Sequence, residues 1–385
     1  MPANVSSNAN QPLSGVRVLD FTRVLAGPYC TAMMADLGAE VIKVEAPHGD
    51  DYRHIGPFRD GESLLFQAVN RGKRSVSLDL KKPEAIATVK ALLADCDVLI
   101  ENFRPGVMDK LGLGYDQLHT AFPHLVYVSV SGFGQTGPYA SQPGYDFIVQ
   151  GMSGMMSITG EPGREPQKIG TALADIMTGL YATIGIQAAL WQRERTGLGQ
   201  QVDLALLDSM VGVLANQAMN YLVSGVAPQR MGNAHPNIVP YQVLEVKNGH
   251  IILAVGNDGQ FQRLCHLLQL DHLSTDEAYA TNSARQIHRE ALTKILAEAF
   301  AKWDKLELLD ALHQCNVPAG PINNIDEVFA DPQVISRGMQ LDLDGVPGVR
   351  TPITFSDAEL TLNEASPKVD QHRAEILAEL KNNKQ

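Results

Sequence analysis

Asp175 is the residue of this sequence best placed for covalent chemistry. It follows Thr171-Ala172-Leu173-Ala174 and stands at the start of a long apolar segment that predicts a helix. One interpretation is a helix N-cap, where an aspartate carboxylate accepts backbone N–H groups. The other is a nucleophile: the helix dipole would keep the carboxylate ionised, and an ionised, partly desolvated carboxylate can attack an activated acyl group. From the residues alone, the cap is favoured.

Basic side chains gather near the predicted ends of several strands. As a set they suit a multiply charged phosphate ligand, although each of them singly is more typical of a solvated surface. The set comprises Lys43, Arg53, Arg71, Lys73, Arg74, Lys81, Arg104 and Lys110.

A glycine-containing turn and a histidine are further candidates. The segment GNDGQF, residues 256–261, follows an apolar strand candidate. It predicts either a turn into a helix, with Asp258 near the N-cap, or a mobile lid with glycine hinges. His235, in GNAHPNIVPYQ, is more typical of a structural histidine than of a catalytic one. The histidines and the four cysteines show no metal-ligand spacing, so we expect no metal site.

Several familiar motifs are missing from the sequence. The first strand-to-helix turn carries Gly27 and Pro28 but no G-x-G-x-x-G. This disfavours NAD binding, although Glu45 stands where a ribose-binding acid would be. There is no P-loop motif, no H-E-x-x-H and no G-x-S-x-G. An NTPase, a zincin and an α/β-hydrolase are therefore unsupported.

Short apolar strands alternate with helical segments through the first part of the chain. This pattern predicts an α/β fold with a mostly parallel sheet, whose ligands bind beyond the carboxyl ends of the strands. The expected strands are 16–22, 39–47, 75–81, 97–103 and 124–133, and the expected helices are 27–38, 82–96, 106–122 and 174–195. Residues 134–172 are predicted to be a long irregular, functional loop.

The pattern changes after Gly225. Residues 226–330 predict a second, smaller α+β domain that contains a hairpin turning at Lys247-Asn248-Gly249. The segment from 331 predicts short strands at 349–356 and a final helix at 370–382, and residues 1–12 predict a flexible tail. Residues 13–225 are predicted to form the first part of the large domain.

Composition narrows the possible partners and compartment. The 385 residues include 31 Lys and Arg against 43 Asp and Glu, a net charge of −12 that argues against a nucleic-acid partner. No run of 18 apolar residues and no secretory signal pattern is present, so we expect no membrane association. Scattered cysteines are typical of a reduced, cytoplasmic protein.

A series of segments, taken together, resembles a known family. They are VLAGP (24–28), LGAEVIKVE (37–45), GKRSVSLDLK (72–81), DVLIENFRPG (97–106), ADIMTGLYA (174–182) and RERTGLGQQVDLALLDS (193–209). In this order and spacing the sequence is similar to the class III coenzyme A transferases, the family of formyl-CoA transferase and carnitine CoA-transferase, which also contains α-methylacyl-CoA racemase. The resemblance covers nearly the whole chain.

The resemblance implies a fold and a mechanism. The large domain, completed by residues 331–385, is expected to be Rossmann-like and to bind CoA, and two chains are expected to interlock as a homodimer. Asp175 matches the family's nucleophile, which reverses the preference for a cap. CoA would pass from an acyl-CoA to a free carboxylic acid through anhydride and aspartyl-CoA thioester intermediates. The resemblance also implies coenzyme A thioesters as substrates and no tightly bound cofactor.

The resemblance also places the CoA contacts by position. These positions are Val24, Leu25, Ala26, Leu78, Lys81, Asn102, Phe103, Lys110, Tyr145 and Asp146, to which we add the neighbouring Arg104. Two positions depart from the family pattern: a family arginine falls on Ala46 and a family lysine on Pro143. The family's glycine-rich lid falls on Gly256, Asn257, Asp258 and Gly259.

Tyr145 separates the two chemistries of this family. Racemases need a paired histidine and aspartate as bases, and their long-loop motif has histidine where this chain has Tyr145. A tyrosine, with an ordinary pKa of about 10, is a poor substitute, so a transferase is expected. The segments around His235 and Gly256 are more similar to members that handle dicarboxylic acids, with succinyl-CoA as donor. A racemase or isomerase and a non-catalytic CoA-binding protein remain the alternatives.

Overall fold

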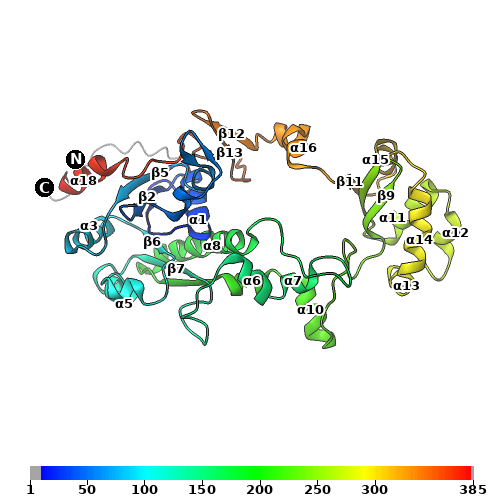
Figure 1. The fold of residues 1–385 in the computed structure, drawn as a ribbon, viewed down its shortest axis with the longest axis horizontal. Coiled ribbons are helices and arrows are strands. Elements are labelled where there is room, and N and C mark those ends of the chain that lie inside the picture. Colours follow the sequence, from blue (N-terminus) through cyan, green and yellow to red (C-terminus); the bar gives the residue numbers. More distant parts are fainter. Residues whose placement is uncertain (1–9, 383–385) are drawn as a thin grey trace. The chain divides into compact units, whose positions relative to one another are not determined.

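The computed structural model describes residues 10–382, which divide into two compact units (Figure 1). The first unit contains residues 10–155, 168–226 and 332–382, and the second contains 156–167 and 227–331. The chain therefore leaves the first unit twice and returns to it. Residues 156–167, assigned to the large domain from sequence, lie in the second unit.

A six-stranded parallel sheet organises the first unit. Its strands are β1 (Arg17–Asp20), β2 (Glu40–Glu45), β5 (Lys73–Ser77), β6 (Val98–Glu101), β7 (Val126–Ser131) and β8 (Gln201–Ala205). Their order in space is β5-β2-β1-β6-β7-β8, and all five pairings are parallel. This is the Rossmann order, which reverses direction between β1 and β6, and ligands bind beyond the strand ends at such a reversal.

Alternating strand residues build one core on each face of this sheet. Val18, Val41 and Val98 pack on one face and Leu19, Ile42 and Leu99 on the other, as side chains of period two require. The first face is covered by α1 (Ala26–Asp36), α6 (Asp146–Met152), α8 (Leu173–Thr196) and α9 (Leu206–Gly212). The second is covered by α3 (Pro83–Leu93), α4 (Val107–Lys110), α5 (Tyr115–Ala121) and α18 (Arg373–Asn382).

Helices α1 and α8 pack very closely on the first face. A Cβ added at Gly179 of α8 would lie 2.7 Å from the Ala26 carbonyl oxygen, closer than real Cβ contacts. Only glycine allows this approach, which brings the first turns of the two helices to one edge of the sheet. The remaining elements of this unit are η1 (Asp51–His54), β3 (Phe58–Arg59), β4 (Glu62–Ser63), α2 (Leu64–Ala68), α10 (Ala215–Ser224), α17 (Pro332–Ser336), β12 (Gln340–Leu343) and β13 (Val346–Val349).

Three local predictions are wrong. The single helix expected at 106–122 is two, because Gly112 takes a left-handed φ of +72° between α4 and α5. The expected loop 134–172 contains α6 and α7 (Met155–Ile158). The strands expected at 349–356 instead form a hairpin at 340–349, since Asp344 and Gly345 both have positive φ and support a tight turn there.

The second unit is a three-stranded antiparallel sheet packed against helices. The strands are β9 (Tyr241–Val246), β10 (Gly249–Ala254) and β11 (Ala319–Pro321), and the predicted hairpin is confirmed by the pairing of Gly249 with Val246. The helices are α11 (Asp258–Leu267), α12 (Asp271–Thr275), α13 (Asn282–Ile287), α14 (Arg289–Phe300), α15 (Lys305–Gln314) and α16 (Ile325–Ala330). Ile251, Phe261 and Leu296 belong to its separate core.

Candidate active site

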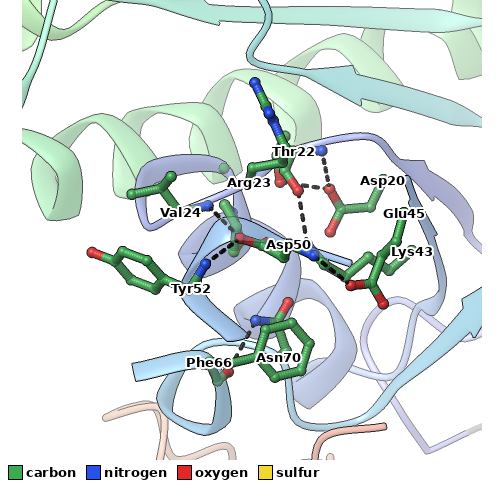
Figure 2. A network of polar contacts seen from close by, with 12 residues as sticks. Asp20, Thr22, Arg23, Val24, Lys43, Glu45, Asp50, Tyr52, Phe66 and Asn70 are labelled. Atoms are coloured by element: carbon green, nitrogen blue, oxygen red, sulfur yellow. Dashed lines mark hydrogen bonds and ion pairs between the residues drawn. The ribbon is translucent and has the colours of Figure 1, made fainter. Parts of the chain in front are cut away.

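The turn that follows β1 is held by buried charged groups (Figure 2). The Asp50 carboxylate accepts the backbone N–H groups of Val24 and Tyr52 at 3.1 and 3.0 Å. It also forms an ion pair of 2.9 Å with Lys43, whose ammonium donates to the Thr22 carbonyl oxygen at 2.7 Å. Val24 has a φ of +70°, a strained conformation for a β-branched residue. Asp50 thus fixes a backbone conformation that valine alone would avoid.

The charges beneath this turn are balanced within the protein. Burial disfavours the charge of Lys43, but the carboxylates of Asp20 and Asp50 outweigh it and raise its pKa. Lys73 lies 3.2 Å from Asp20, and there burial prevails, lowering the pKa of Lys73 to about 8. The two ammonium groups in turn overcome burial and hold the pKa of Asp20 below its ordinary value.

Five of the eight basic residues singled out in the sequence serve this internal balance. Lys43 and Lys73 are buried; Arg53 pairs with Glu45, Arg71 with Asp36, and Arg74 with Glu40 and Glu379. They are neither a solvated face nor free to bind a phosphate. The Arg53 pair also occupies Glu45, so this carboxylate is not available to a ribose. Lys81, Arg104 and Lys110 are the exposed members of the set.

Asn102, at the end of β6, holds the same turn from its other side. Its side-chain oxygen accepts the Arg23 N–H at 2.9 Å, and its amide nitrogen donates to the Arg23 carbonyl at 2.8 Å. Asn102 therefore clamps the backbone of Arg23. The Arg23 guanidinium lies over the Phe103 ring, 5.2 Å from its centroid, and 3.3 Å from the exposed Asp51 carboxylate.

A pocket of about 210 Å³ lies between these strand ends and the first turn of α8. Its lining includes residues predicted as site residues from the sequence: Val24 to Ala26, Asn102 to Arg104, Tyr145 and Asp175. Gly132 and Gly144 also line it, and a Cβ on either would come within about 2.5 Å of the other's Cα. Two backbone segments cross there at a distance that excludes side chains. The structure thus brings eight of the predicted residues to one pocket.

Asp175 is the third residue of α8 and is partly buried. The cap interpretation is wrong: Ala172 occupies the N-cap position, and Asp175 makes no cap hydrogen bond. The expected stabilisation of its ionised form is also wrong, because burial and the charge of Asp146 raise the pKa of Asp175 to about 7. At neutral pH this carboxyl group is therefore near its midpoint.

A second carboxylate does cap α8, but from another helix. Asp146, the first residue of α6, accepts the Ala174 N–H at 2.7 Å with one oxygen and the Gln150 side-chain amide at 2.8 Å with the other. Gln150 is fully buried and accepts the Ile169 N–H at 2.9 Å. These bonds tie the backbone on both sides of Ala172 to α6. Asp146 is absent from the lining of the pocket that contains Asp175.

A second pocket, of about 260 Å³, adjoins the first and lies beyond β1, β2 and β5. Leu78 and Lys81 line it, and Arg23 and Phe103 line both pockets. The two positions that depart from the family pattern are on these walls: Ala46 lines this pocket, and Pro143 lines the pocket of Asp175. Lys110 is exposed on α4 and lines neither pocket.

The candidates at 256–259 and His235 belong to the second unit. Asn257 caps α11 by accepting the Gln260 N–H at 2.9 Å, which confirms the turn-into-helix interpretation, and Asp258 pairs with Arg285 at 2.7 Å. His235 accepts the N–H of Asn237 at 3.0 Å with its Nδ1. This bond fixes the local turn, and the structural role that the sequence favoured for His235 stays a prediction.

Three comparisons with known proteins show the family of the chain. The model of CoA-transferase family III matches residues 13–373. The chain belongs to CoA-transferase family III. A succinate–glutarate CoA-transferase of Agrobacterium fabrum is 53% identical over 97% of this chain and 96% of its own length. A succinyl-CoA:glutarate CoA-transferase of Homo sapiens is 41% identical over 97% and 87%.

A solved structure supports the same family. The crystal structure of a CaiB/BaiF family protein from Brucella suis has a TM-score of 0.86 and 55% identity, covering 96% of this chain and 100% of that one. The protein is thus a CoA-transferase whose central sheet has the arrangement of this family.

Sequence reasoning missed four residues of this CoA-transferase site. Asp50 and Gln150 act by holding backbone, and Asp51 lines the pocket. Tyr52 lies near the carboxylates: burial, Asp175 and Asp50 raise its pKa. Their only signal in the sequence was position, since GDDYR follows a strand end and Gln150 stands four residues after Asp146.

Proposed function

We propose that this CoA-transferase moves CoA from succinyl-CoA to a small dicarboxylic acid such as glutarate, with Asp175 as covalent nucleophile. The observation that carries the proposal is the partly buried Asp175 carboxyl group in the pocket beyond β1 and β6, with its pKa raised to about 7. The substrates are supported by the names of the relatives from Agrobacterium fabrum and Homo sapiens.

The first half-reaction transfers CoA to the protein. The Asp175 carboxylate attacks the thioester carbonyl and the C–S bond breaks. CoA thiolate departs, and an acyl–aspartyl anhydride is formed. The thiolate then attacks the aspartyl carbonyl and expels succinate, which leaves an aspartyl-CoA thioester. This covalent route preserves the energy of the thioester, provided that water is excluded.

The second half-reaction follows the same steps in reverse. A carboxylate of the acceptor attacks the aspartyl thioester and releases CoA thiolate, which forms a second anhydride. The thiolate attacks the acceptor's carbonyl, which yields the new acyl-CoA and frees the Asp175 carboxylate. No net proton is taken up or released. The protein therefore needs no permanent acid or base beside Asp175.

The pocket walls offer groups for the charged parts of the substrates. The start of α1 has no side-chain cap at Leu25, and Leu25 and Ala26 line the pocket, so we assign the stabilisation of developing oxyanions to the first backbone N–H groups of α1. Arg23 and Arg104 supply positive charge for phosphates or for the second carboxylate of a dicarboxylic acid. The adjoining pocket, with Leu78 and Lys81, suits the nucleotide end of CoA.

The test is a covalent trapping experiment. Wild type and Asp175→Asn are incubated with succinyl-CoA, and intact mass is measured before and after hydroxylamine treatment. We expect a CoA-sized, hydroxylamine-sensitive adduct on the wild type alone and glutaryl-CoA when glutarate is added. Exchange of solvent deuterium into the α-carbon without CoA transfer would instead identify a racemase. An Asp175→Asn variant that keeps full transfer activity would refute the nucleophile.

We also propose that the protein is a homodimer. Helix α8 buries one side in the first unit, while Ile184 and Trp191 are 62% and 69% exposed. Leu222 and Val223 of α10 are 71% and 80% exposed. A second copy would cover such apolar area. Within residues 10–382, α8 is also the one helix long and apolar enough to cross a membrane, but its buried side belongs to the core.

Light scattering after size exclusion tests this assembly. We expect the wild type to have the mass of two chains and Trp191→Glu to shift toward one. Lys90→Glu, which places the same charge at an exposed position of α3 on the other face of the sheet, is the control. A wild type with the mass of one chain at micromolar concentration would refute the dimer.

A further inference from the structure

Two carboxylates meet at the start of α8, and they are bonded differently. Asp146 Oδ1 accepts the N–H of Ala174, the residue that precedes Asp175. Among residues 10–382, no hydrogen bond to the Asp175 carboxylate is present. One carboxylate therefore takes an unpaired N–H of the helix end, and the other is left without a fixed partner.

Asp146 is itself held rigidly. Its Oδ2 accepts from Gln150 one turn later on α6, and the buried Gln150 in turn accepts the Ile169 N–H. Gln150 Nε2 also approaches the Thr171 carbonyl at 3.4 Å. Asp146 and Gln150 thus connect α6 to the chain before α8 and to the first turn of α8. A shift of Asp146 would move the backbone that carries Asp175.

We propose that Asp146 is a positioning residue for the nucleophile rather than a contact of CoA: it fixes the first turn of α8 and places a negative charge beside Asp175. The inference rests on the proposed role of Asp175. It changes the role expected for Asp146 from the family pattern. The neighbouring Tyr145, 67% exposed and lining the pocket, keeps the position expected of a ligand contact.

The charge of Asp146 has a consequence for the proton affinity of the nucleophile. Burial and Asp146 are the causes that raise the pKa of Asp175 to about 7. The other charged or titratable groups that line the same pocket are Arg23, Asp51, Arg104 and Tyr145, and Tyr52 lies near Asp175 as well. Removing the charge of Asp146 alone is expected to lower the pKa of Asp175.

The first test is the pH profile of kcat/KM for Asp146→Asn. Asparagine keeps an oxygen for the Ala174 N–H and removes the charge. We expect the acidic limb to move down by about half a unit to one unit, as for two partly solvated charges several Å apart. At pH 6 the wild type would retain about one tenth of its plateau, and the variant about a quarter to a half. The KM for succinyl-CoA is expected to stay within about twofold.

A second variant guards against a loss of folding. In Asp146→Asn, the new side-chain NH₂ group would face the NH₂ group of Gln150, and two donors would meet. In the double variant D146N/Q150E, the asparagine NH₂ group can donate to the glutamate carboxylate instead. This variant keeps an acceptor for Ile169 and moves the charge one turn along α6. We expect the limb to move down by less than in Asp146→Asn, because the charge is moved away from Asp175 and not removed. Asp208→Asn, an exposed carboxylate on α9, is the control and leaves the limb in place.

The outcomes separate this inference from the proposed function. An unchanged limb with a tenfold higher KM for succinyl-CoA would show that Asp146 contacts CoA and would overturn the inference. If the wild type transfers no CoA, the proposed function fails on its own. The inference is then tested without activity, by measuring the pKa of Asp175. The infrared band of its protonated carboxyl group is followed against pH, after subtraction of the spectrum of Asp175→Asn. An apparent pKa that is equal in wild type and D146N would overturn it.

Discussion

Replacing Asp175 by asparagine is expected to abolish transfer and to stabilise the fold. The unfolded carboxyl group has a pKa of 3.8, and the folded one about 7, because of burial and Asp146. Between these values the folded protein holds a proton that the unfolded chain releases. The free energy of unfolding therefore falls as the pH rises from about 4 to 7, and it stays low above 7. Asparagine has the shape of the neutral acid and lacks this penalty.

The size of the effect follows from the two pKa values. Linkage gives a stabilisation of about 2 kcal/mol at pH 5 and about 4 kcal/mol at pH 8. Both energies are upper limits, because Asp175 is partly in contact with solvent and solvent screens part of the unfavourable interaction. At about 2 °C per kcal/mol for a unit of this size, Tm rises by about 4 °C at pH 5 and about 8 °C at pH 8. The growth of the difference with pH is the signature, since a better-packed side chain would give a constant one.

Calorimetry of wild type and Asp175→Asn at both pH values measures this difference. Protein concentrations must match, because an assembly ties Tm to concentration. The exposed Asp208→Asn variant is the control for loss of one negative charge. A Tm gain that is equal at pH 5 and pH 8, or a loss at pH 8, would falsify the assignment of a raised pKa to Asp175.

Three further predictions concern the turn after β1. Asp50→Asn removes one of the two carboxylate charges that balance the buried Lys43, while Asp20 remains, so it is expected to destabilise the protein by about 1–3 kcal/mol and to raise the KM for succinyl-CoA; an unchanged Tm would contradict this. Val24→Gly removes strain of about 1–3 kcal/mol at a φ of +70°, less the extra entropy of glycine, so Tm is expected to rise slightly, and a clear fall would argue against strain. Asn102→Ala breaks both bonds to the Arg23 backbone and is expected to raise the KM for succinyl-CoA about tenfold with a smaller effect on kcat; a selective loss of kcat would point to direct participation in the chemistry.

The sheet could be predicted because its signals are local. Each buried strand has its own apolar run, and the helix between two strands supplies a period of 3.6 residues, so β1, β2, β5, β6 and β7 were expected close to their observed bounds. The errors lie where local signals mislead. Residues 134–172 are rich in glycine and were expected to be irregular, yet α6 and α7 form there through packing on the rest of the chain.

The site was only partly predictable, since several of its residues act across long sequence separations. Asp175 could be found from the sequence, but the carboxylate that caps its helix is Asp146, which accepts the Ala174 N–H across 28 positions. The basic residues show the same limit, because their partners are also distant in the sequence. Charge and position suggested a phosphate site, whereas Lys43 and Lys73 satisfy buried carboxylates that the sequence places on other elements. Nothing in a one-dimensional pattern distinguishes a cation that faces solvent from one that faces Asp20.

The raised pKa of Asp175 suits the two steps in which it exchanges with CoA thiolate. An ordinary carboxylate, with a pKa near 4, is a far better leaving group than a thiolate with a pKa of about 8.5, so an anhydride formed from it would mostly revert. At about 7, the Asp175 carboxylate differs from the thiolate by about 1.5 units, which favours the forward attack. Asp146→Asn should therefore have two opposite effects: activity persists to lower pH, while the plateau of kcat falls severalfold. A variant that keeps the wild-type plateau while its limb moves would show that basicity of the nucleophile does not limit the reaction.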